Sequence, residues 1–98
     1  MKSPASRNRE AAEVLAIQAL AFIAEDTQRL ARFLDMTGIA PEQIRTAARE
    51  RGFLAGVLEH MLGDESLLIA FADRAGIDPE DVARARGALG YREERDRT

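Results

Sequence analysis

The sequence predicts an all-α domain, a small bundle of about six short helices arranged as two tandem three-helix repeats. Three observations support this fold class. Every periodic segment of the chain places apolar residues at helical spacing. Aspartate, proline and glycine stand where helices begin and end. A gapless shift of 38 residues also brings the two halves into register.

The repeat comprises about residues 15–52 and about residues 53–90. The shift aligns Asp26 with Asp64, Gly38 with Gly76 and Pro41 with Pro79, together with several apolar positions. Half of a 98-residue chain is too short to bury its own apolar face, so both repeats must share one core. The chain is therefore predicted to form a single domain over 9–90, between a disordered arm at 1–8 and a disordered polar tail at 91–98.

The first helix is predicted over about 9–24, and its counterpart in the second repeat over about 53–62. Gln18 is the only polar residue in the eleven-residue run 14–24. A helix that is apolar on all sides belongs in the centre of a bundle, so these two helices are expected to meet there. Gly56 marks either a close approach to a neighbouring helix or a tolerated neutral glycine.

The second helix of each repeat is amphipathic, with a cap at both ends. Asp26 and Asp64 are predicted N-caps, whose carboxylates accept from backbone N–H groups of the first turn. Gly38 and Gly76 are predicted to end these helices in the left-handed conformation, which costs glycine little.

The third helix of each repeat begins at a proline. Pro41 and Pro79 suit the first helical position, where a missing N–H costs nothing, and Asp78 is a good N-cap. These helices are predicted to run to about Glu50 and about Leu89. A glycine is predicted to close each repeat: Gly52 and Gly90.

The composition excludes several classes of protein. The chain has 14 basic and 17 acidic residues, a formal charge of −3, and no cysteine, which rules out disulfides and thiolate metal sites. The polar N-terminus does not resemble a signal peptide, and the most apolar run is too short to span a membrane. A cytoplasmic protein that does not enter a membrane is expected.

Residues suited to catalysis are few. His60 is the only histidine, so one chain cannot assemble a two-histidine metal site or a histidine relay. No glycine-rich phosphate loop is present. We therefore predict no catalytic, metal or cofactor-binding residues and expect a protein that is not an enzyme.

A DNA-binding alternative depends on residues 68–82, which resemble a helix-turn-helix. The helix that would enter the groove starts with Pro-Glu-Asp, and its acidic residues would face phosphates. The corresponding helix of the first repeat offers more positive charge, from Arg45, Arg49 and Arg51. Nucleic acid is nevertheless the less favoured partner.

The two repeats differ at positions that a shared architecture leaves free. Phe22 aligns with His60, and Met36 aligns with Arg74, so the first repeat is apolar where its twin is polar. We predict that Phe22 or Met36 borders an exposed apolar patch that binds a protein partner.

A family resemblance covers roughly residues 13–89. The runs Leu15–Asp26 and Phe53–Leu58, with Thr37-Gly38-Ile39 and Ala75–Glu80, resemble the bacterial family catalogued as domain of unknown function 3572. The resemblance implies a small cytoplasmic bacterial protein and brings no activity, cofactor or site residue with it. The favoured function is a non-enzymatic regulatory or adaptor module that binds a protein, as a monomer or a homodimer.

Overall fold

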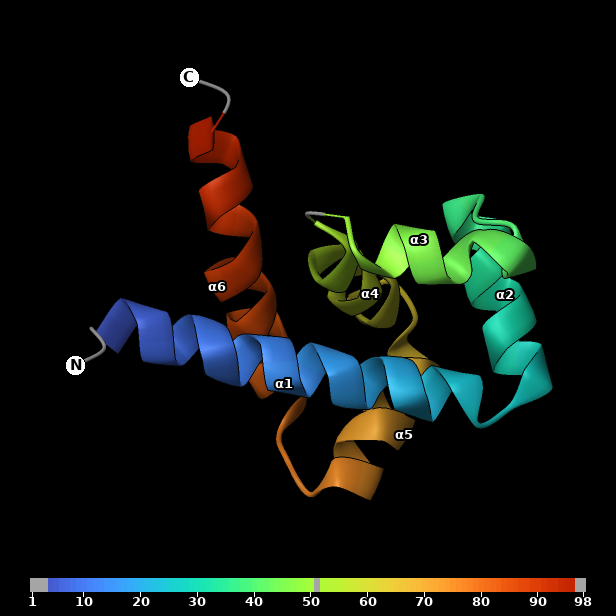
Figure 1. Cartoon of the computed structure of the whole chain (residues 1–98). Coiled ribbons are helices and arrows are strands. Elements are labelled where there is room, and N and C mark those ends of the chain that lie inside the picture. The colour runs from blue at the N-terminus through green and yellow to red at the C-terminus, as the bar shows by residue number, and fades with distance from the viewer. Residues whose placement is uncertain (1–3, 51, 97–98) are drawn as a thin grey trace.

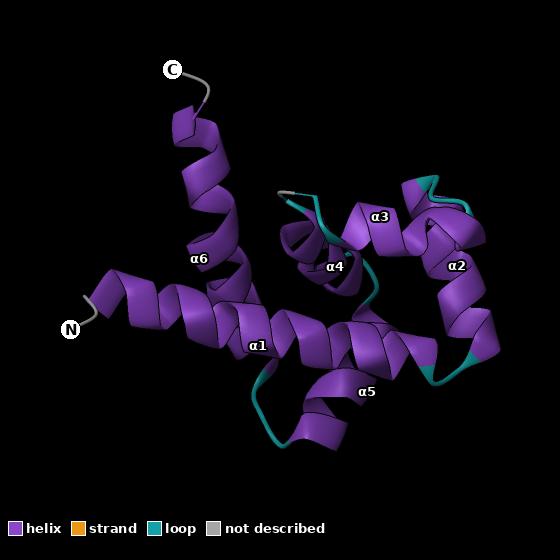
Figure 2. Cartoon of the chain, in the orientation of Figure 1, coloured by secondary structure: helices purple, strands orange, loops and turns teal. Residues whose placement is uncertain are grey.

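The computed structural model describes residues 4–50 and 52–96, and this part of the chain is almost entirely helical, with short connections (Figure 2). It contains six α-helices and one 3-10 turn: α1 (Pro4–Ala24), α2 (Thr27–Thr37), η1 (Pro41–Gln43), α3 (Ile44–Ala48), α4 (Phe53–Leu62), α5 (Glu65–Ala75) and α6 (Pro79–Asp96). The predicted all-α class is confirmed.

Helix α1 forms one side of the bundle. It crosses the molecule with α4 and α6 on its far side, and both helices pack against it (Figure 1). Helix α2 contacts α1 near its C-terminal end, and α5 contacts α4 and α6. The predicted pairing of the two most apolar helices is present as the α1–α4 contact, but α1 is covered on one side only.

The core is apolar throughout and draws on all the α-helices except α3. Its buried members include Ala12, Ala16, Ala19, Phe22, Ile23, Phe33, Ala55, Val57, Leu58, Met61, Leu67, Phe71, Val82, Ala85 and Leu89. The alanines of α1 are small, which lets α4 and α6 approach its backbone closely.

Both amphipathic helices are capped at the predicted residues. The Asp26 carboxylate accepts hydrogen bonds from the backbone N–H groups of Gln28 (2.8 Å) and Arg29 (3.1 Å). Asp64 accepts from the N–H of Leu67 at 3.2 Å. These bonds satisfy donors that have no partner within the helix, which stabilises each helix start.

The C-terminal caps of these two helices differ in detail. Gly38 (φ 76°) and Gly76 (φ 72°) are both left-handed. The N–H of Gly38 donates to the Leu34 carbonyl, a single bond. After α5, by contrast, Gly76 and Ile77 donate to the carbonyls of Asp73 and Ala72, which is the full Schellman pattern.

The 38-residue repeat is not confirmed as a structural duplication. Helices α2 and α5 have the same length, 11 residues, and their bounds are offset by the predicted shift. The third helices, however, pack differently: α6 lies against both α1 and α4, whereas α3 contacts mainly η1 and α4. Leu89 gives α6 a buried contact one turn beyond Ala85. The aligned position in the first repeat is Arg51, which lies outside the described residues.

Two predicted helix ends are wrong. Helix α1 begins at Pro4, so residues 4–8 are not an irregular arm, and proline suits a helix start. Helix α6 passes through Gly90 and continues to Asp96. The run 92–96 is rich in arginine and glutamate, which favour helix strongly enough to outweigh the cost of one glycine.

Helix α6 begins at Pro79, as predicted. The backbone N–H of Asp78, the residue before the helix, donates to the carboxylate of Asp81, the third residue of the helix, at 3.1 Å. The Asp81 carboxylate is paired with Arg84. The Arg84 hydrogen bond, followed by the Asp78 N–H, lowers the pKa of Asp81.

Candidate functional site

Helix α1 carries two apolar stripes on opposite sides. Ala12, Ala16, Ala19 and Ile23 are buried against the rest of the molecule. On the opposite side lie Val14, Ile17, Ala21 and Ala24, which we call the α1 stripe. Val14 and Ile17 are each 55% exposed, and both alanines are exposed as well. Large aliphatic side chains with this exposure on one helix face are typical of an interaction surface.

The α1 stripe was not predicted as a site. The apolar run 14–24 predicts a helix buried on all sides in the centre of the bundle. The sequence alone does not mark this stripe, because apolar residues surround the helix axis and Gln18 is the only polar residue between positions 14 and 24. The packing of the other helices determines which side of α1 stays exposed.

Phe22, a predicted partner-binding residue, is buried, with only 5% of its surface exposed. Its ring packs against Phe71, with ring centroids 5.6 Å apart. The Arg29 guanidinium lies 4.1 Å from the centroid of the Phe22 ring, and that of Arg74 lies 5.8 Å away. Two arginines and a second aromatic ring therefore cover the Phe22 ring.

Met36, the other predicted partner-binding residue, is 71% exposed at the C-terminal end of α2. An exposed methionine suits a contact surface because its unbranched, polarisable side chain adapts to a partner. Its role in binding stays a prediction.

A hollow of about 250 Å³ adjoins the α1 stripe. Gln18, Ala21 and Phe22 line it from α1, and Phe71 and Arg74 line it from α5. At its edge Glu25 pairs with Arg74, with N–O distances of 2.9 and 3.0 Å. The Phe22 ring thus contributes to the surface next to the stripe, although the residue itself is largely covered.

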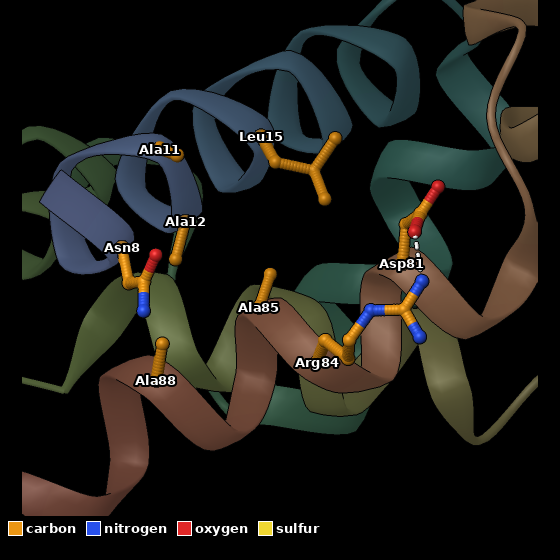
Figure 3. A pocket seen from close by; sticks show the side chains of 8 residues that line it. All are labelled: Asn8, Ala11, Ala12, Leu15, Asp81, Arg84, Ala85 and Ala88. Carbon is orange, nitrogen blue, oxygen red and sulfur yellow. Dashed lines mark hydrogen bonds and ion pairs between the residues drawn. The ribbon is translucent and has the colours of Figure 1, made fainter. Parts of the chain in front are cut away.

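A wider groove of about 520 Å³ lies between the N-terminal half of α1 and α6 (Figure 3). Its lining is mostly small and apolar: Ala11, Ala12 and Leu15 from α1, Ala85 and Ala88 from α6, with Asn8, Asp81 and Arg84 at the ends. The Arg84 guanidinium points at Asp81 and is paired with it, so the charge at that end is largely neutralised.

The arginines of the DNA-binding alternative lie on and just after a very short helix in the part of the chain that the structure describes. Helix α3 has only five residues, and of its arginines Arg45 lies within it and Arg49 just beyond it, both exposed. Arg51 lies outside the described residues. On α6, Arg84 pairs with Asp81, and Arg86 with Glu59 at 2.6 Å. These pairings reduce the positive charge that α6 could present to phosphates.

His60 is a packing residue in this fold. Its ring stands edge-on to Phe33, with centroids 5.1 Å apart, and its Nε2 atom is buried with no hydrogen-bond partner among the described residues. Burial lowers the pKa of His60 below its usual value of 6.5; Asp64 opposes this shift and Arg32 adds to it. The neighbouring Glu59 is paired with Arg86 rather than with His60.

His60 should therefore make the fold less stable in acid. As the pH falls below about 6.5, the unfolded chain binds a proton at this histidine before the folded chain does. The stabilisation is complete above that pH and is lost progressively as the pH falls toward the lowered pKa. Between about pH 7.5 and about pH 5.5, urea denaturation should show a larger loss of unfolding free energy for the wild type than for His60→Leu. Equal losses would show that His60 does not titrate differently in the two states.

The part of the chain that the structure describes, residues 4–50 and 52–96, contains no cluster of three or more histidine, aspartate or glutamate residues suited to a metal ion. None of its helices combines the length and apolar character needed to cross a bilayer.

Comparison with known proteins places the chain in a family. Residues 9–92 match the model of the family described as Protein of unknown function (DUF3572). The match spans most of the chain, so the chain belongs to this family. No curated protein and no solved structure gave a match.

Proposed function

We propose that this chain is a non-enzymatic protein-interaction module, in a regulatory or adaptor role, that packs the α1 stripe against a helix of its partner. The observation that carries the proposal is the 55% exposure of Val14 and of Ile17 on the side of α1 facing away from α4 and α6. Burying a valine or isoleucine that was exposed contributes about 1.5–3 kcal/mol, so covering this pair favours association.

The environment of the single histidine supports a role without catalysis. A general acid or base must reach the proton that it transfers. His60 packs against Phe33 with its Nε2 atom buried, and Glu59 is held by Arg86. These groups serve packing and ion pairing.

The proposal is tested by capture on immobilised protein from an extract of the source cells. Val14→Glu combined with Ile17→Glu should abolish retention of a protein that the wild type binds, because two buried carboxylates would be unpaired. Met36→Glu tests the second exposed site in parallel. Ile69→Glu, at a position on α5 that is 52% exposed, is the matched control and should retain the partner. Identical protein profiles for all four forms would contradict the proposal, provided that circular dichroism shows each variant to be folded.

A further inference from the structure

We infer that the partner of the α1 stripe is a second copy of this chain, packed antiparallel so that two α1 helices form the interface of a symmetric dimer. This inference rests on the proposed function and specifies the occupant of the same surface.

The spacing of the residues in the α1 stripe is typical of packing against another helix. Val14, Ile17, Ala21 and Ala24 are separated by three, four and three residues, which is the alternation of a coiled-coil seam. Residues at this spacing form a narrow line along a helix, which packs into the grooves of a second helix at a shallow angle. In an extended peptide every second side chain lies on the same face, and this two-residue period does not match the three- and four-residue spacing of the α1 stripe.

The charge of the surface favours an apolar partner. No charged residue occurs in the run 14–24, although charged residues make up 32% of the chain. Nucleic acids and highly charged peptides would find no opposite charge along the stripe. A second α1 stripe has the same neutral, apolar character.

Side-chain size selects the antiparallel arrangement. The stripe has its two large residues, Val14 and Ile17, at one end and two alanines at the other. When the helices run in opposite directions, Val14 lies opposite Ala24 of the second copy, and Ile17 lies opposite Ala21. Each large side chain then faces a small one, which keeps the helices at an even separation and fills the space between them. Parallel helices would place large against large at one end and leave a gap between alanines at the other.

The residues beside the seam are compatible with this register. In antiparallel pairing Gln18 lies near Gln18 of the second copy, close to the two-fold axis, and two amides can hydrogen-bond to each other. Gln18 is exposed, and it also lines the hollow between α1 and α5. The second helix would therefore pass along the edge of this hollow and cover part of it.

The extent of the stripe predicts a weak dimer. Its ten-residue span is about 15 Å of helix, less than the contact surface of a standard stable interface, which buries about 800 Å² per partner. We expect a dissociation constant on the order of 10–100 µM.

Sedimentation equilibrium of the purified 98-residue chain, from about 1 µM to about 1 mM, measures the association. The wild type should change from monomer to dimer across this range. Val14→Glu combined with Ile17→Glu should weaken dimerisation at least about tenfold, because charges would be buried at the seam. Ile69→Glu, an equally drastic change at an exposed residue of α5, should leave dimerisation unaltered. A wild type that stays monomeric to about 1 mM, or that loses its dimer with Ile69→Glu alone, would overturn the inference.

Introduced cysteines test the direction of the helices, since the chain contains no cysteine of its own. A mixture of Val14→Cys and Ala24→Cys chains should form mainly the mixed disulfide under mild oxidation, because these positions meet only in the antiparallel register. Predominant Val14→Cys homodimers would indicate parallel helices and exclude the register described.

The two proposals can fail separately. If the purified chain is monomeric but its capture of another protein depends on Val14 and Ile17, the interaction surface is real and its occupant is not a second copy. If self-association and capture are both unaffected by the double substitution, the α1 stripe is not an interaction surface and both proposals fail.

Discussion

Replacing Phe33 by alanine is expected to lower the free energy of unfolding by about 3–5 kcal/mol, the usual cost of removing a buried aromatic side chain. Phe33 is 1% exposed and is the one residue of α2 that is fully buried. Its ring lies edge-on to Phe53, with centroids 6.2 Å apart, and to His60 at 5.1 Å. Truncation would remove both of these ring contacts between α2 and α4.

Urea denaturation followed by circular dichroism measures this loss. Met36→Ala provides the matched control on the same helix, and its effect should stay within about 0.5 kcal/mol because that side chain is 71% exposed. Phe33→Leu retains most of the apolar volume and should cost about 1 kcal/mol, so the position can be assessed even if the alanine variant does not fold. A cost below about 1 kcal/mol for Phe33→Ala would mean that α2 is held by other contacts.

The helix caps could be predicted from the sequence because their physics is local. A carboxylate at Asp26 or Asp64 reaches N–H groups only two or three residues away. A glycine such as Gly38 ends a helix through its own backbone conformation. Such features need no knowledge of what packs around them, so the bounds of α2 and α5 follow from a few residues.

The packing of α1 could not be predicted in the same way. Apolar residues on all sides of a helix show that all sides avoid water, but not which side the rest of the same chain covers. The covered side of α1 is determined largely by α6, which packs against α1. Buried Val82, Ala85 and Leu89 give α6 a continuous apolar face. The repeat directed attention to differences between equivalent positions and hence to Phe22. The side chains that cover Phe22, those of Arg29 and Arg74, belong to two other helices. A comparison of equivalent positions in the two repeats does not reveal them.

Glycine-to-alanine substitutions should have opposite effects at two positions of this chain. Gly76 has φ 72°, and apart from Gly76 itself and its two chain neighbours no residue has an atom within 4 Å of the place that a Cβ would occupy. The cost of Gly76→Ala is therefore purely that of the left-handed backbone, about 1–2 kcal/mol of lost stability, and Gly38→Ala should cost the same. Gly56 also has open space around its Cβ position but lies inside α4.

At Gly56 alanine adopts the native conformation without strain and restricts the unfolded chain. Gly56→Ala should therefore stabilise the fold by about 0.5–1 kcal/mol. The open space around the Cβ position favours a tolerated neutral glycine at Gly56 over a close approach of a neighbouring helix, because a close approach would place atoms near the added methyl group. Urea denaturation of the three single variants measures all these effects under one condition. A destabilised Gly56→Ala would restore the close-approach explanation, and an unchanged Gly76→Ala would mean that the chain after α5 readily adopts another turn.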